Sequence, residues 1–177
     1  MAVYTYFGSM SAIVREIVHD GFARLQRLFD LVDTTDDPVA DMALLGRVYR
    51  HNAITNRHVF DVMFGGSSLA GFALTEEDRQ YGRFTLATVV DCAYRCAAAG
   101  RFHQEDPALK AHHMWLGVHG TVTLDLGGYL VPPYDPTLCF ETQLVSLMIG
   151  AGDDPVSAAR SVTVSGDRFD AGFGQAT

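Results

Sequence analysis

The chain opens with Met1-Ala2-Val3-Tyr4-Thr5-Tyr6-Phe7-Gly8-Ser9-Met10-Ser11. Aromatic residues followed by a glycine and a serine are typical of a helix end, a tight turn and the cap of a new helix. From Ser9 onward, apolar residues recur every three or four positions, which predicts an amphipathic helix of about 24 residues, roughly 36 Å long. These positions are Ile13, Val14, Ile17, Val18, Phe22, Leu25, Leu28, Phe29 and Val32. The opening stretch therefore marks a junction between two helices.

Asp-Pro pairs predict where further helices begin. An aspartate can accept hydrogen bonds from the free N–H groups of a helix start, and proline is tolerated at the first helical position. Such pairs occur at Asp37-Pro38, Asp106-Pro107 and Asp135-Pro136. Another start is indicated by Thr75-Glu76-Glu77-Asp78, in a helix that continues to Gly100. The predicted helices cover about 38–54, 55–63, 75–100, 107–130 and 136–150.

Strand signals are sparse, so the fold is expected to be an all-α helical bundle. The second half of helix 75–100 is apolar on most of its circumference, which predicts that this helix lies at the centre of the bundle. The stretch 65–73 is rich in glycine and serine and is expected to be a loop. After Gly150 the chain is rich in Gly, Asp and Ser without a sustained period, so 151–177 is expected to be a flexible tail.

The composition favours a folded, acidic domain. Apolar residues make up 48% of the 177 residues, enough for a sizeable core. The 13 Lys and Arg residues against 21 Asp and Glu give a formal charge of −8, whereas nucleic-acid-binding domains usually carry a basic surplus. No signal peptide and no apolar run of membrane-spanning length is visible, and three cysteines argue against a disulfide framework. The expected compartment is the cytoplasm.

The familiar patterns of catalytic and metal sites are absent from the sequence. There is no glycine-rich phosphate loop after a strand, no Gly-X-Ser-X-Gly and no His-Glu-X-X-His, so we expect no enzyme and no cofactor. His112 and His119 fall roughly on one side of a helix, but no familiar metal-motif spacing is present, and no metal is expected. Cys92 and Cys96 are either two small buried apolar residues or a redox-sensing pair.

The opening stretch and a second stretch, Trp115-Leu116-Gly117-Val118-His119-Gly120, together resemble the TetR family of transcriptional regulators. The first is similar to the end of the family's DNA-recognition helix. The second is similar to the Trp-His-Gly motif of one type of TetR regulatory domain. The resemblance implies that 1–8 is a remnant of the recognition helix and its turn, with most of the helix-turn-helix missing. It also implies that 9–150 is a ligand-binding and dimerisation domain.

The resemblance also bears on DNA binding. In the family, a tyrosine of the recognition helix commonly contacts a DNA phosphate, and Tyr4 and Tyr6 are the matching positions. Met10 stands where the family often has a phosphate-binding lysine. The recognition helix of a helix-turn-helix needs its supporting helix. We therefore expect that this chain does not bind DNA specifically by itself.

The segment from Arg50 to Gly65 also resembles the family's regulatory domain, through Tyr49-Arg50 and the run from Asn56 to Gly65. A similar run in the family forms a short helix beside the ligand cavity. The resemblance implies a mainly apolar cavity between helices 9–32, 38–64, 75–100 and 107–130, suited to a hydrophobic or aromatic ligand. The same side chains can instead simply fill a core, Asp91 can instead form an ion pair with Arg95, and His119 can instead be a hydrogen-bonded core residue. The candidate ligand-binding residues are Phe22, Phe60, Met63, Phe64, Val90, Asp91, Tyr94, Trp115, Val118 and His119.

A homodimer is implied as well, because the last two helices of the family pack against their twofold mates as a four-helix bundle. Helix 136–150 carries more apolar residues than one internal face needs, which indicates an interface. Glycines in helix 107–130 permit close helix approach despite their cost of about 1 kcal/mol each against alanine. The candidate interface residues are Gly117, Gly120, Leu144 and Met148.

Three functions remain possible from the sequence. The leading hypothesis is the effector-binding and dimerising part of a TetR-type transcriptional repressor, with a hydrophobic small molecule as its effector. The alternative is a helical-bundle enzyme or carrier for a hydrophobic small molecule, for which Asp91 and His119 are the residues to test. A third possibility is a purely structural dimer with a filled core.

Overall fold

The computed structural model describes residues 10–65 and 74–174, which contain seven α-helices and no strand. The prediction of an all-α fold is confirmed. Residues 1–8 with Tyr4 and Tyr6, and all of the predicted loop 65–73 except Gly65, lie outside the described residues. The helices are α2 (Met10–Phe29), α3 (Pro38–Thr55), α4 (Arg57–Gly65), α5 (Glu76–Ala98), α6 (Pro107–Leu126), α7 (Pro136–Ala151) and α8 (Pro155–Gly172).

The predicted helix starts are confirmed by their caps. Asp37, Asp106 and Asp135 each accept a backbone N–H from two or three residues later, at distances between 3.0 and 3.2 Å. A proline follows each of them in the first turn. Thr75 and Asp78 form a reciprocal capping box at the start of α5. The aspartate and proline residues in the sequence therefore determine where these helices begin.

The prediction of a flexible tail after residue 150 is wrong, because α8 is a regular helix that packs against α3. A fourth Asp-Pro pair, Asp154-Pro155, caps it, with Asp154 accepting the backbone N–H of Ser157 at 2.9 Å. Its buried stripe includes polar Ser161 and Ser165. A hydroxyl can be buried where it is hydrogen-bonded, and the hydroxyls of both serines are. The buried face of α8 therefore contains polar residues, so the sequence does not show an apolar stripe there.

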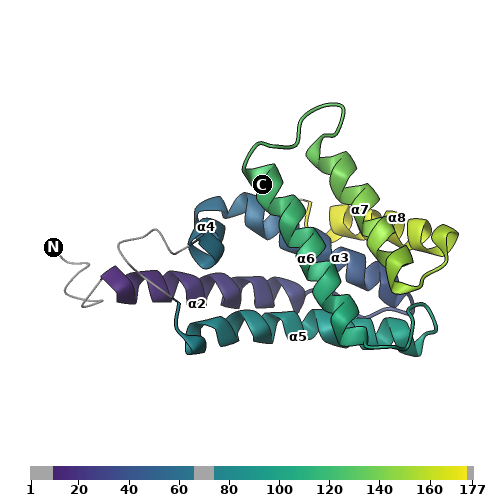
Figure 1. Ribbon diagram of the computed structural model, residues 1–177, viewed down its shortest axis with the longest axis horizontal. Helices are drawn as coiled ribbons and strands as arrows, with labels where there is room; N and C mark the ends of the chain where they lie inside the picture. The colour runs from purple at the N-terminus through teal and green to yellow at the C-terminus, as the bar shows by residue number, and fades with distance from the viewer. Residues whose placement is uncertain (1–9, 66–73, 175–177) are drawn as a thin grey trace.

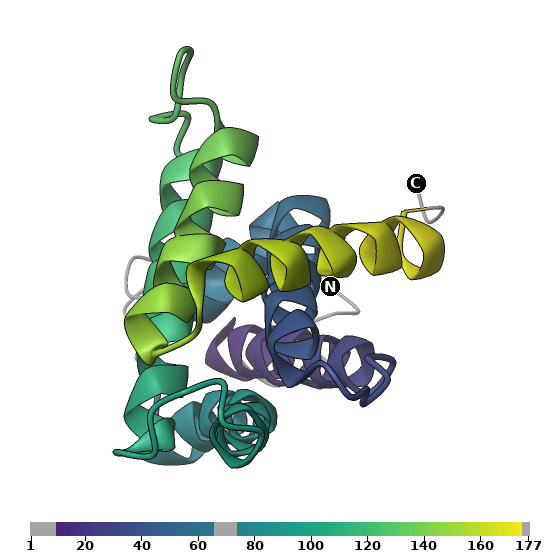
Figure 2. The ribbon, with the colours of Figure 1, turned by 90° about the vertical axis from the view of Figure 1, so that its right-hand side faces the viewer.

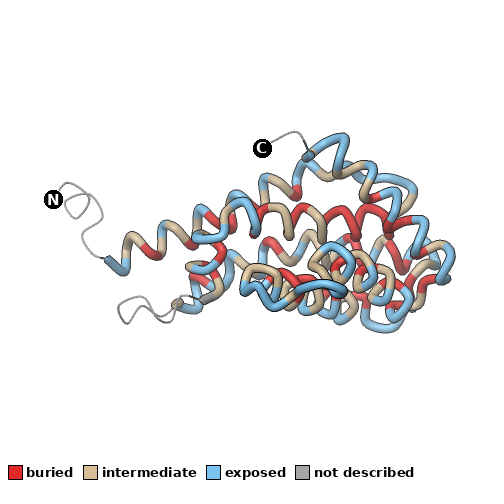
Figure 3. The backbone as a smooth tube through the Cα atoms, turned by 90° about the horizontal axis from the view of Figure 1, so that it is seen from above, coloured by how far each residue is buried: buried red, intermediate tan, exposed pale blue. Residues whose placement is uncertain are grey.

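The helices form two groups that share α3 and α6. In Figure 1, α2 and α5 lie side by side along the long axis, with α4 against α2. Figure 2 shows α6 and α7 side by side, with α8 crossing α3. The tube in Figure 3 shows buried positions along the inner sides of the helices and exposed positions outside. The two groups meet along α3, which contacts each of the other six described helices.

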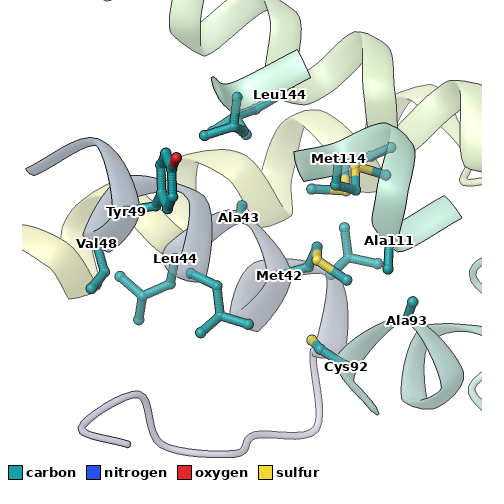
Figure 4. Packing of buried hydrophobic residues seen from close by; sticks show 14 of the residues in the cluster. Met42, Ala43, Leu44, Val48, Tyr49, Cys92, Ala93, Ala111, Met114 and Leu144 are labelled. Atoms are coloured by element: carbon teal, nitrogen blue, oxygen red, sulfur yellow. The ribbon is translucent and has the colours of Figure 1, made fainter. Parts of the chain in front are cut away.

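The central helix is therefore α3 and not, as the sequence predicted, the helix at 75–100. Twelve of the 18 residues of α3 are buried, whereas α5 exposes Phe84 and Tyr94 to solvent. Figure 4 shows Met42 of α3 among side chains from α5 and α6. Small residues on α3, such as Ala43 with no exposed surface, let several helices approach it closely. A high density of apolar residues on α5 did not distinguish a central helix from one with an apolar outer surface.

Buried carboxylates join α3 to its neighbours. Asp41 of α3 lies 2.6 Å from Arg95 of α5 and 2.7 Å from Arg168 of α8. Burial raises the pKa of Asp41, but hydrogen bonds from Thr35, Arg168 and Arg95 outweigh it, so that the pKa is lowered below its ordinary value. Arg95 thus pairs with Asp41 across helices and not with Asp91 along its own helix.

Candidate functional site

A cavity of about 330 Å³ lies between α2, α3, α4, α5 and α6. This is the region in which the sequence predicted a ligand cavity. Most of its lining side chains are apolar, and several are aromatic. The lining residues are Phe22, Leu25, Phe29, Tyr49, Met63, Phe64, Leu74, Arg79, Gly82, Arg83, Thr85, Leu86, Val89, His112 and Trp115.

Glycines set the width of the cavity end formed by α2 and α5. A Cβ atom at Gly82 of α5 would lie 3.0 Å from the ring of Phe22, so this glycine allows the ring to lie against the α5 backbone. A Cβ at Gly21 of α2 would lie 2.4 Å from the sulfur of Met63. The rings of Phe22 and Phe64 meet edge to face, with centroids 5.8 Å apart. Close backbone approach and aromatic contacts thus position this wall.

The inner end of the cavity is formed by Tyr49, with His119 behind it. The hydroxyl of Tyr49 and Nδ1 of His119 lie 2.7 Å apart, inside a group of aromatic rings. Burial raises the pKa of Tyr49, and a hydrogen bond from Trp115 lowers it by less. Burial also lowers the pKa of His119. Both groups are therefore neutral near pH 7, and the inner end of the cavity carries no charge.

Aromatic rings surround this pair. The direction of the hydrogen bond between the Tyr49 hydroxyl and Nδ1 of His119 depends on which ring nitrogen of His119 carries the proton. The rings of Phe64 and Trp115 lie 4.6 and 5.9 Å from the His119 ring, centroid to centroid. Trp115 and His119, the two motif residues singled out from the sequence, thus lie next to each other on α6.

Several of the candidate ligand-binding residues do line the cavity: Phe22, Met63, Phe64 and Trp115. His119 and Phe60 lie behind this wall, with the Phe60 ring 4.9 Å from that of Phe64. Val118 lines a smaller adjoining cavity of about 40 Å³, which shares Tyr49 and Trp115 with the larger one.

Three candidates on α5 are placed wrongly. Val90, Asp91 and Tyr94 do not line the cavity, and Tyr94 is 53% exposed. The lining face of α5 instead carries Gly82, Leu86 and Val89. One residue along a helix turns the side chain by about 100°, so the prediction was off by one position in the rotation of this helix. Apolar residues occur on both faces of α5, so the sequence does not show which face of this helix is turned toward the cavity.

Sequence reasoning missed Tyr49, Leu25, Phe29 and the arginines of α5 as cavity residues. Leu25 and Phe29 continue the same stripe of α2 that presents Phe22, so the helical period could have found them. Tyr49 stands in the stretch that resembles the regulatory domain, but no local pattern pointed to the cavity, because its role depends on His119, 70 positions away in the chain.

The candidate dimer residues divide into two kinds. Leu144 and Met148 are 2% and 0% exposed within one protomer, so the prediction that they form an interface is wrong. A Cβ at Gly117 would lie 2.9 Å from Leu147, so this glycine serves the contact of α6 with α7 in the same chain. Gly120 has no atom within 4 Å of its Cβ position and faces outward.

The described residues show no metal centre. In the ranges 10–65 and 74–174 no three His, Cys, Asp or Glu side chains converge in a way that could hold an ion. Cys92 and Cys96 are buried, and a hydrogen bond with Cys92 together with burial raises the pKa of the Cys96 thiol, which disfavours the thiolate. Within the same ranges, no helix is long and apolar enough to cross a membrane.

Comparison with known proteins agrees with this arrangement. Residues 42–147 match the family model described as Tetracyclin repressor-like, C-terminal domain. The chain therefore belongs to the TetR family of regulators, and the match covers a regulatory domain of that family. No protein with a curated description matches the sequence.

Two solved structures share the fold. A protein of unknown function from Rhodococcus sp. RHA1 superposes with a TM-score of 0.71 at 21% identity, covering 83% of this chain and 75% of the other. A protein named "putative regulatory protein SCO4313" superposes with a TM-score of 0.64 at 21% identity, covering 82% of this chain and 77% of the other. At this identity the likeness concerns the fold.

Proposed function

We propose that this chain is the effector-binding and dimerising part of a TetR-type transcriptional repressor. The observation that carries the proposal is the apolar cavity of about 330 Å³ in a chain whose residues 42–147 match a TetR-like regulatory domain. Small-molecule sites are typically concave and mostly apolar, with volumes of roughly 300–1,000 Å³ and a few polar groups that fix orientation. The Tyr49–His119 pair is such a group.

The position of α2 supports a regulatory use of this cavity. Phe22, Leu25 and Phe29 of α2 line it, while the resemblance places the remnant of the DNA-recognition helix directly before α2. A ligand that prefers one position of α2 would shift the population of chains toward that position. The spacing of two DNA-binding heads would follow, which is how binding could change repression.

The cavity is not expected to catalyse a reaction on its ligand. Asp91, one of the two residues that the sequence offered for chemistry, is exposed on the outer side of α5. The other, His119, is hydrogen-bonded to Tyr49 behind the cavity wall. Reversible binding is therefore the expected behaviour of the cavity.

Trp115 provides the test, because it is the only tryptophan of the chain and lines the cavity. A panel of hydrophobic and aromatic molecules should contain members that change Trp115 emission and raise the melting temperature. The Phe64→Ala variant should bind these members more weakly, by about 1–3 kcal/mol. If no member changes either signal, or if a member is chemically converted, the proposal is wrong.

We propose that a second copy of the chain covers the outer face of α6 and α7. Leu116 and Leu138 are 60% and 46% exposed on this face. Charged residues are typically depleted at the centre of an interface, and this stripe carries none, although Lys110 lies beside His113 and Ser146 at one end of it. It consists of Leu109, His113, Leu116, Gly120 and Leu124 on α6 and Leu138, Thr142, Ser146 and Ile149 on α7.

Light scattering of the Leu116→Glu variant tests the dimer. The wild-type chain should be a dimer at micromolar concentration, and Leu116→Glu should be a monomer that keeps its helical circular dichroism. Val156→Glu on α8, where the valine is equally exposed, is the control and should remain a dimer. A monomeric wild-type chain, or a dimer that Leu116→Glu leaves unchanged, would contradict the assignment.

We further propose that residues 1–177 alone do not bind DNA specifically. The formal charge of −8 opposes the phosphate contacts that dominate such binding. Fragments from the region upstream of its own gene should show no sequence-dependent binding at moderate salt. Nanomolar, sequence-dependent affinity would refute this.

A further inference from the structure

Cationic side chains line an otherwise apolar cavity at its solvent end. Arg79 and Arg83 lie one turn apart on α5, on the same face as Gly82 and Leu86. Their side chains are 54% and 52% exposed, which places the guanidinium groups at the mouth. His112 of α6 also lines the cavity and is exposed. The solvent end of the cavity is thus the cationic end.

One carboxylate serves both arginines. Nη1 of Arg79 lies 3.8 Å from Oε2 of Glu76, and Nη2 of Arg83 contacts Oε1 of the same residue. Glu76 is 71% exposed, and ion pairs at such positions are weak because water screens them. Two guanidinium groups therefore share a single, weakly held negative charge, and one positive charge is left in excess.

A buried carboxylate nearby, Asp78, does not change this balance. Asp78 is turned toward α2, where Nε of Arg15 donates to it at 3.0 Å and Nε2 of His19 lies 2.9 Å away. It also caps α5 through Thr75. The negative charge of Asp78 is thus paired with Arg15 and does not neutralise Arg79 or Arg83.

The interior offers no second place for an anion. The Tyr49–His119 pair at the inner end is neutral, and the Thr85 hydroxyl donates to the carbonyl of Tyr81 within α5. An ion moved into such apolar surroundings would lose its hydration without gaining a partner. A ligand that carries a negative charge can therefore place it only at the mouth.

We propose that the effector is an apolar molecule with a single carboxylate headgroup. The carboxylate pairs with Arg79 and Arg83 in place of Glu76, and the apolar body lies against Phe22, Phe64 and Trp115. Arginine suits this role because its planar guanidinium matches a carboxylate with two parallel hydrogen bonds. This inference rests on the proposed function, since it names the class of ligand for the same cavity.

A matched pair of probes tests the headgroup: decanoic acid and 1-decanol, each titrated against the full chain with Trp115 emission as the readout. Both carry the same apolar chain, so they differ only in the carboxylate. Decanoate should bind roughly tenfold more tightly than the alcohol near neutral pH, the size of effect expected from one charge-assisted pair. Added salt should reduce this preference, because the mouth is open to solvent.

Variants at the mouth should change the preference for decanoate over 1-decanol: loss of an arginine should lower it, and loss of Glu76 should raise it. Arg79→Gln and Arg83→Gln should each weaken decanoate binding several-fold and leave 1-decanol binding unchanged. Glu76→Gln should strengthen decanoate binding, because it removes the competing carboxylate. A gain of affinity cannot arise from unfolding. Arg160→Gln, at an exposed position on α8, makes the same charge change away from the lining residues and should have no effect.

The outcomes separate the two proposals. If decanoate and 1-decanol bind equally and the mouth variants change neither, the cavity binds apolar molecules but the headgroup assignment is overturned. If neither probe changes Trp115 emission or the melting temperature while the panel of hydrophobic molecules does, the apolar carboxylate is again overturned. If nothing in the panel binds, the proposed function fails and this inference fails with it.

Discussion

The two halves of the bundle differ in how their interiors are filled. One half is formed by α3, α7 and α8, and the other by α2, α4 and α5. In the first, which we call the ion-paired half, arginines join the helices, as Arg47 does with Glu141 and Ser165, and the hollow beside Arg47 is smaller, about 150 Å³, and partly polar. In the second, the cavity half, the walls enclose about 330 Å³. Protein interiors rarely contain voids larger than a water molecule. The ion-paired half therefore fixes the shape of the domain, whereas a ligand can fill the space in the cavity half.

The largest difference is expected between truncations of a core leucine and of a cavity-wall phenylalanine. Leu144→Ala should lower the free energy of unfolding by about 3 kcal/mol, because Leu144 is 2% exposed and its removal adds a side-chain-sized void to the cavity of only about 40 Å³ that it lines. Phe64→Ala only enlarges an existing cavity and should cost about 1 kcal/mol. Urea unfolding of both variants without ligand measures this. Equal losses would mean that the two halves are equally well packed.

A second prediction concerns the buried carboxylate of the ion-paired half. Asp41→Asn should lower the free energy of unfolding by about 2–3 kcal/mol, because Arg95 and Arg168 would lose their shared negative partner. Asp20→Asn is the control, since the Asp20 side chain is exposed and lies 3.8 Å from Arg27, and it should change stability by less than about 0.5 kcal/mol. A loss at Asp41 as small as at Asp20 would show that this network does not hold α8.

The cavity half contains its own acid-sensitive group. Burial alone would raise the pKa of Asp78. Hydrogen bonds from Thr75, together with His19 and Arg15, outweigh this effect and lower the pKa to about 2. Since the pKa in the folded state is below that in the unfolded state, the stabilisation is present above about pH 4 and is lost as the pH falls toward 2. Urea unfolding across this range should show a steeper loss of stability for the wild-type chain than for Asp78→Asn. Parallel curves would contradict this.

The smallest effect on stability is expected at Gly82. In Gly82→Ala the new Cβ would meet the Phe22 ring at 3.0 Å, but this ring borders the cavity and can move into it. The gain in helix propensity, about 1 kcal/mol at most, should offset the shift, so stability should change little while ligand affinity falls. Gly150→Ala, where no atom lies within 4 Å, is the control and should leave affinity unchanged. A strongly destabilised Gly82→Ala would mean that the cavity half is rigid.

The beginnings of the helices could be predicted because the signals are local. Asp37 and Asp135 hydrogen-bond to residues two or three positions away, so a short stretch of sequence contains the whole interaction. The start of α8 carried the same signal at Asp154. It was missed because Ser161 and Ser165 look polar in the sequence, and their burial depends on partners in distant segments such as Arg101 and Arg47.

The candidate site could be predicted only in part, because helix rotation depends on tertiary contacts. α2 has one apolar stripe, so Phe22 was placed correctly on the cavity. α5 has apolar residues on two faces, so Val90 was chosen in place of Val89. Leu144 was assigned to an interface because α7 has more apolar residues than one face needs, and the sequence alone does not show which of its faces meets α3. The packed neighbours decide these choices.

The bonds of Arg47 bear on how the chain folds as it is synthesised. This residue of α3 is joined to Glu141 and Ser165, which follow it by 94 and 118 positions. The ribosome releases α3 long before these partners exist, and contacts between distant segments form slowly. The contacts of α3 with α2, α4 and α5 form from helices made before or soon after it, but the face of α3 toward α7 and α8 stays uncovered until those helices have emerged. We expect the nascent chain to be most prone to aggregation in this interval.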